Sequence, residues 1–75
     1  MKPYKNLAGN SGVAANEIGE DFIKVKFRGG DVYLYNYSVT GRDNVERMKE
    51  LAEEGKGLST FISKYVRERY AEKSE

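Results

Sequence analysis

The side chains best suited to chemistry lie in the stretch 22–38, FIKVKFRGGDVYLYNYS. Cations alternate with apolar residues in its first half, and tyrosines alternate with other residues in its second half. Alternation with a period of two predicts two β-strands, each with one buried and one exposed face. Either Gly29-Gly30 or Gly30-Asp31 can supply the positive φ angles of a two-residue hairpin turn. The stretch therefore predicts a β-hairpin.

With either turn, the parity of the pairing assigns the same residues to each face. The face expected to enter the core carries Ile23, Val25, Phe27, Val32 and Leu34. The face expected to remain open carries three cations interleaved with three tyrosines, namely Lys24, Lys26, Arg28, Tyr33, Tyr35 and Tyr37.

Tyrosine rings can stack on unpaired bases while lysine and arginine contact phosphates, as in sheet-borne binders of RNA and of single strands. This face therefore predicts an accessory module that contacts RNA or single-stranded nucleic acid. Two alternatives stay open. Cross-strand Tyr–Lys pairs can simply stabilise a solvated sheet face, and the same patch can bind a protein partner or a second copy of the chain.

A weaker candidate is a phosphate site at Lys56, Gly57, Ser59 and Thr60. Backbone N–H groups at the start of a helix, two hydroxyls and an ammonium would meet there. The stretch is not a P-loop, because the glycine four residues upstream of a Gly-Lys-Ser/Thr run is missing. Ordinary helix punctuation explains the same residues and is favoured.

Composition argues against catalysis and against a cofactor. The chain has 75 residues and no cysteine or histidine, so no histidine can activate Ser59 or Thr60 and no Cys/His set can hold zinc. Adjacent carboxylates need a cleft that tunes their pKa values apart, for which so small a chain has little room.

With 13 basic and 12 acidic residues, the net charge of +1 requires that any basic surface come from local segregation. Neither a signal peptide nor a membrane span is expected, and a cytoplasmic location is the default.

The remaining elements are read from periodicity. Residues 1–10 are expected to be a flexible arm, 11–18 a first strand, and 73–75 a tail that follows a single domain over 11–72. A helix capped by Thr40 should carry the apolar stripe Val45, Met48, Leu51 and Ala52 and end at Gly55. A second helix should run from about 58 to 71, with Leu58, Phe61, Ile62, Tyr65 and Val66 on one apolar arc. Pairing is expected between the acidic stretch 46–54 and the basic stretch 64–73. The expected fold is α+β: a three-stranded antiparallel meander followed by two helices on one face (β-β-β-α-α).

Two spaced patterns resemble a known family. Phe27, Gly30, Tyr33 and Tyr35 fit F-x-x-G-x-x-Y-x-Y, and further along the chain Val66-Arg67-Glu68-Arg69-Tyr70 is similar to I/V-R-x-x-Y. Together they resemble the KTSC domain, a small bacterial and phage module also found at the C-terminus of some lysyl-tRNA synthetases. The resemblance covers about residues 12–70 and implies no established activity. Its association with a synthetase suggests contact with nucleic acid.

Overall fold

The structure is a computed structural model that describes residues 1–7, 9 and 11–74. The described residues form an antiparallel sheet whose five strands follow the order of the chain, β1-β2-β3-β4-β5. The strands are β1 (Lys2–Pro3), β2 (Val13–Ile18), β3 (Phe22–Phe27), β4 (Val32–Asn36) and β5 (Glu72–Ser74). Between β4 and β5 lie the helical elements α1 (Tyr37–Thr40), α2 (Arg42–Glu54), α3 (Leu58–Phe61) and the π-helical turn η1 (Ile62–Val66).

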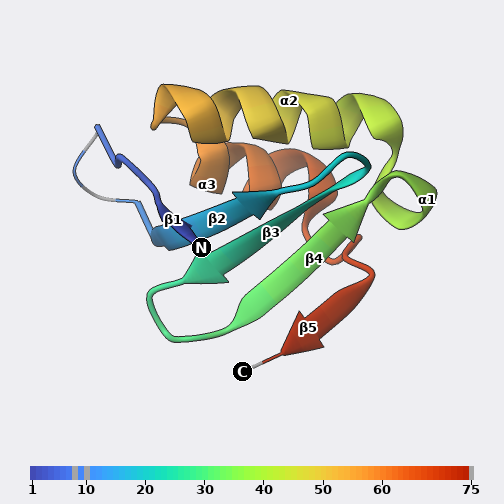
Figure 1. Ribbon diagram of the computed structural model, residues 1–75, viewed down its shortest axis with the longest axis horizontal. Helices are drawn as coiled ribbons and strands as arrows, with labels where there is room; N and C mark the ends of the chain where they lie inside the picture. Colours follow the sequence, from blue (N-terminus) through green and yellow to red (C-terminus); the bar gives the residue numbers. More distant parts are fainter. Residues whose placement is uncertain (8, 10, 75) are drawn as a thin grey trace.

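Figure 1 shows α2 and α3 over one face of the sheet, while the opposite face is left uncovered. The predicted α+β class and the placement of the helices on one side are confirmed. The predicted three-stranded sheet was wrong in detail. It gains a strand at each edge, and β5 returns to the sheet only after the helices.

The register of the β3–β4 hairpin differs from the prediction. Lys26 pairs with Val32 and Val25 with Tyr33, and the loop contains three residues, Arg28, Gly29 and Gly30. The Gly30 amide donates to the Phe27 carbonyl at 2.9 Å, and Gly30 has a φ of 101°. This is the three-residue hairpin with a left-handed glycine in its last position. An odd loop length reverses the parity, so β4 presents the opposite set of side chains to the core.

Both chain ends are more ordered than expected. Residues 1–10 were predicted to be a flexible arm, but Lys2 and Pro3 pair with β2, and Tyr4 is buried in the core. Residues 73–75 were predicted to be a tail, but β5 pairs with β4 through Glu72, Lys73 and Ser74. Within these two segments, Ala8, Asn10 and Glu75 lie outside the described residues.

Helix α2 agrees closely with its predicted pattern. Its buried residues are the predicted stripe, Val45, Met48, Leu51 and Ala52, and Gly55 ends it in a left-handed conformation. The predicted cap was wrong, since Gly41 occupies the N-cap position and the fully buried Thr40 donates its hydroxyl to the Arg69 carbonyl instead. Asp43 still lies in the first turn, where the helix dipole favours a carboxylate.

The second helical segment is shorter than predicted and changes type within its length. An α-helical turn over Leu58–Phe61 continues into the π-helical η1, and the helix stops at Arg67 rather than near residue 71. Leu58, Ile62 and Val66 are buried as expected, but Tyr65 is 60% exposed. Arg67 then adopts φ 34° and ψ −103°, a backbone conformation that strains a residue with a Cβ.

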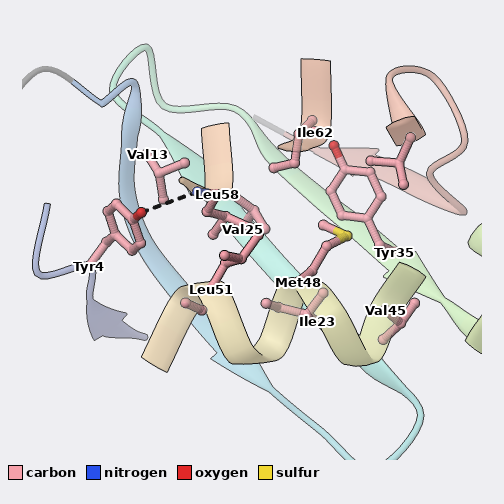
Figure 2. Packing of buried hydrophobic residues seen from close by; sticks show 12 residues of the cluster. Tyr4, Val13, Ile23, Val25, Tyr35, Val45, Met48, Leu51, Leu58 and Ile62 are labelled. Atoms are coloured by element: carbon pink, nitrogen blue, oxygen red, sulfur yellow. Dashed lines mark hydrogen bonds between the residues drawn. The ribbon is translucent and has the colours of Figure 1, made fainter. Parts of the chain in front are cut away.

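The core lies between the sheet and the helices, with Ile23 and Val25 of β3 packed against Val45, Met48 and Leu58 (Figure 2). Val32 and Leu34, predicted to be core residues, pair with Lys26 and Lys24 on the uncovered face, and Tyr33 and Tyr35 take their place. Among the described residues, no helix combines the length and the apolar character needed to cross a membrane.

Candidate functional site

The predicted face of interleaved cations and tyrosines does not form. Lys24 and Lys26 lie on the uncovered side of the sheet, opposite Leu34 and Val32, whereas Tyr33 and Tyr35 point toward the helices. The reason is the three-residue loop, which reverses the parity of β4 relative to β3. Arg28 lies in that loop, where its Nε donates to the Ser11 carbonyl at 3.0 Å.

Tyr37 is held in a separate cluster at the start of the helices. Its hydroxyl lies 2.6 Å from a Glu46 carboxylate oxygen and 3.1 Å from the Glu20 carbonyl oxygen. The Lys49 ammonium lies 2.7 Å from the same Glu46 oxygen and 5.5 Å from the centre of the Tyr37 ring. Tyr37 therefore joins the β2–β3 turn to α2, which is a structural role rather than the predicted stacking role.

The two other tyrosines line a cleft of about 490 Å³ between the sheet and the α3–η1 segment. The sheet contributes Phe27, Tyr33, Tyr35 and the β5 residue Lys73, with Asp31 at the hairpin end. The helical side contributes residues from the α3–η1 segment and the chain that follows it, namely Ser59, Ile62, Ser63, Arg67, Glu68 and Tyr70. A volume of this size is in the usual range for pockets that hold small ligands.

Four aromatic rings define the walls of this cleft. Tyr33 and Tyr35 are nearly parallel, with centroids 6.4 Å apart. Tyr70 is perpendicular to both, at 4.8 Å from Tyr33 and 6.4 Å from Tyr35, and Phe27 meets Tyr33 edge to face at 5.4 Å. These contacts fix the rings in place, and Phe27, Tyr33 and Tyr70 keep part of their surface exposed. The cleft is thus a rigid aromatic site.

Tyr35 forms the floor, and its hydroxyl is the most informative group in the cleft. The residue as a whole is only 1% exposed, and its hydroxyl forms no hydrogen bond among the described residues. No buried polar side-chain atom of these residues lacks a partner, so the hydroxyl is open to the cleft rather than sealed in the core. In Figure 2 the hydroxyl lies on the side of Ile62, another residue of the cleft. Burial raises the pKa of Tyr35, with smaller contributions from Tyr33 and Tyr70, so it stays a neutral donor and acceptor. A hydroxyl that opens into a cleft and has no bond within the fold is free to bond a ligand or water.

The rim of the cleft carries charges of both signs. Lys73 lies 3.9 Å from Asp31 and 5.5 Å from the centre of the Tyr33 ring. Arg67, in its strained conformation after η1, forms no ion pair with the described residues. Strained residues and π-helical turns are over-represented at binding sites. Arg67 is therefore the charged group best placed to meet an anionic ligand.

The predicted phosphate residues Lys56, Gly57, Ser59 and Thr60 do lie together. They surround a smaller depression of about 200 Å³ that also contacts Tyr4, Asn6 and Ser11. However, the first backbone N–H group of α3 is not available to a phosphate, because the Leu58 amide donates to the buried Tyr4 hydroxyl at 3.3 Å. The geometry agrees with the end of one helix at a glycine and the start of the next, and the phosphate site stays a prediction.

Charge is segregated along the chain in a way that the sequence did not predict. The four glutamates of α2 pair with Lys2, Arg47 and Lys49 rather than with the basic segment after α3. Residues 55–67 contain three cations, Lys56, Lys64 and Arg67, and no carboxylate. These three form no ion pair within the part of the chain that the structure describes. Residues 55–67 therefore form a basic strip in the sequence of a nearly neutral molecule.

Sequence reasoning missed Arg67 and Tyr70 as site residues, although a signal was present. Both belong to the R-x-x-Y pattern, and Phe27, Tyr33 and Tyr35 belong to the upstream pattern of the same resemblance. All five line the cleft.

No family model, curated protein or solved structure matches the chain. The similarity to the KTSC domain thus stays a prediction, and the geometry of the cleft must support the function. The described residues contain no cluster of three or more potential metal ligands.

Proposed function

We propose that the protein is a non-catalytic module that binds single-stranded nucleic acid by taking an unpaired base into the cleft between the sheet and η1. The observation that carries this proposal is the Tyr35 hydroxyl, which forms no hydrogen bond to the described residues and opens into a cleft walled by aromatic rings. A base has planar faces that suit the rings of Tyr33 and Tyr70 and polar edges that can bond the hydroxyl.

The charges around the cleft favour a nucleotide over an apolar peptide side chain. The cleft lining carries two cations, Arg67 and Lys73, and two carboxylates, Asp31 and Glu68, and Lys73 is paired with Asp31. Arg67 forms no ion pair among the described residues and would meet the phosphate of an inserted nucleotide, and Lys64 and Lys56 extend the basic strip. The Ser59 and Ser63 hydroxyls add hydrogen-bonding groups on the helical wall. A paired base inside a duplex cannot enter such a cleft without being unstacked, so single strands are favoured.

The test is a binding measurement with fluorescent single-stranded RNA and DNA homopolymers. Tyr35→Phe removes only the hydroxyl and should weaken binding about two- to tenfold, as expected for one hydrogen bond. Tyr4→Phe removes a hydroxyl that is bonded inside the core and serves as the matched control, with binding unchanged. Equal affinities of Tyr35→Phe and the wild type would contradict the proposed role of the hydroxyl.

A protein partner or a second copy of this chain is the other possible occupant, and the same experiment distinguishes it. Binding of an aromatic side chain from a partner would be insensitive to added nucleic acid and only weakly dependent on salt. If the oligonucleotides do not bind at low salt, the proposal fails.

A further inference from the structure

On the other side of the α3–η1 segment, a second hollow lies outside the cleft. It measures about 470 Å³ and is lined by Phe61 and Tyr65, with Leu51 at its base and Arg47 and Lys64 among its polar residues. The Phe61 and Tyr65 rings lie 4.9 Å apart and are tilted by 40°. Tyr65 is 60% exposed, so most of its surface is available to a ligand.

The π-helical turn explains why this tyrosine faces solvent. Spacing alone predicted Tyr65 on the buried arc with Ile62 and Val66, but within η1 only Ile62 and Val66 are buried. The turn thus keeps the core contacts of the helix while it exposes an aromatic side chain. Since π-helical turns are rare and occur often at functional sites, this exposure calls for a functional explanation.

We propose that Phe61 and Tyr65 form a second base-binding subsite, so that one strand places successive bases on both sides of the α3–η1 segment. This inference rests on the proposed function, since it needs the first base in the cleft. Lys64 lines the second hollow and Arg67 lines the cleft. The strand between the two subsites would therefore cross a surface that holds both cations.

The charges support a polyanion rather than a neutral partner. Arg47 is engaged by Glu50 at 3.2 Å and Glu54 at 3.9 Å, whereas Lys64 forms no ion pair among the described residues. Residues 55–67 contain no carboxylate, and Glu68, which follows Arg67, lies on the cleft side of the segment and does not line the second hollow. An exposed aromatic pair next to such cations combines the two features of sequence-tolerant single-strand sites.

The test compares a mononucleotide with a tetranucleotide of the same base. Tyr65→Ala should weaken binding of the tetranucleotide about five- to a hundredfold, the range for the loss of one stacked base, and leave mononucleotide binding unchanged. Because Tyr65 is largely exposed, this variant should fold. Val39→Ala, at another exposed apolar position, is the control and should alter neither affinity.

Each outcome decides between the two proposals. If both ligands bind but Tyr65→Ala matches the wild type on the tetranucleotide, the second subsite is wrong and the cleft proposal stands. An equal loss for both ligands would also overturn it, since Tyr65 would then act on the first site. If neither ligand binds the wild type at low salt, both proposals fail. A length effect that Tyr65→Ala abolishes supports the second subsite.

Discussion

At the scale of single residues, the two buried tyrosines Tyr4 and Tyr35 have the same chemistry and opposite surroundings. Tyr4 accepts a hydrogen bond from the Leu58 amide, which ties the N-terminal segment to the start of α3. The Tyr35 hydroxyl has no such bond among the described residues and reaches the cleft. A hydroxyl that forms no hydrogen bond within the fold and opens into a cleft suggests a role in binding.

This contrast predicts different stabilities for two conservative variants. Tyr4→Phe should lower the free energy of unfolding by about 0.5–1.5 kcal/mol, because the Leu58 amide loses its partner. Tyr35→Phe should leave the free energy of unfolding unchanged or slightly raise it, because no protein hydrogen bond is lost. Urea denaturation of both variants measures the difference. A large loss in Tyr35→Phe would show that the hydroxyl serves the fold instead.

The Glu46 carboxylate predicts a pH dependence of stability. The hydrogen bonds from Lys49 and then Tyr37 hold the pKa of Glu46 below its ordinary value. A carboxyl whose pKa is lowered in the folded state stabilises the fold above its ordinary pKa of about 4.3, and this contribution is lost as the pH falls through the folded value. The wild type should therefore be more stable than Glu46→Gln at pH 7, and the gap should close on acidification.

Urea denaturation at about pH 7 and about pH 3 measures that gap on either side of the titration. Glu17→Gln provides the control, since Glu17 is exposed and forms no ion pair among the described residues. A gap that stays constant between the two pH values would show that the Glu46 cluster does not contribute to stability.

At the scale of elements, the hairpin loop decides which side chains enter the cleft. Gly29 and Gly30 both face open space, so an added Cβ meets no atom at either position, but only Gly30 has a positive φ. Gly30→Ala should therefore destabilise the protein by about 1–2 kcal/mol. Gly29→Ala should be neutral or stabilise it by up to about 1 kcal/mol. Equal unfolding midpoints for the two variants would contradict the three-residue loop.

The sequence predicts an element well where local residue spacing determines it, and poorly where contacts with distant parts of the chain determine it. The stripe of α2 and the glycine at its end follow from local spacing, and both are confirmed. The hairpin itself was also predictable, but its register depends on a loop one residue longer than the two turns considered. That single residue moved Tyr33 and Tyr35 from the expected open face to the cleft.

The other departures involve contacts between segments distant in the sequence. Strand β5 has three exposed residues with no strand-like pattern and forms because the chain returns to β4 after η1. The π-helical turn that exposes Tyr65 likewise gives no signal in residue spacing. The cleft combines residues from β3, β4, β5, η1 and the chain after η1. Only the paired motifs Y-x-Y and R-x-x-Y indicated in advance that these parts belong together.

At the scale of the whole molecule, a net charge of +1 is compatible with binding a polyanion because the charges are distributed unevenly. Four of the five carboxylates of α2 are paired, within that helix or with Lys2, namely Glu46, Glu50, Glu53 and Glu54, whereas residues 55–67 carry only cations. The uncovered sheet face, once expected to bind nucleic acid, combines Lys24 and Lys26 with Val32 and Leu34 and lacks the tyrosines.

The basic strip predicts a modest salt dependence of nucleic-acid binding. Lys64→Gln should weaken tetranucleotide binding and reduce the slope of log K against log salt by about 0.7, the value for one phosphate of a single strand. Lys24→Gln, on the uncovered face, should leave the slope unchanged. If Lys24→Gln reduces the slope and Lys64→Gln does not, the strand binds the sheet face and not the strip.

The most direct test of the central claim is an NMR titration of the tyrosine-ring and amide resonances with a single-stranded tetranucleotide at low salt. Binding in the cleft predicts shifts at the rings of Tyr33, Tyr35 and Tyr70 and at the Arg67 amide, with the Tyr37 ring unaffected. The same shifts should weaken in Tyr35→Phe. Shifts confined to Lys24 and Lys26, or none at all, would contradict the account.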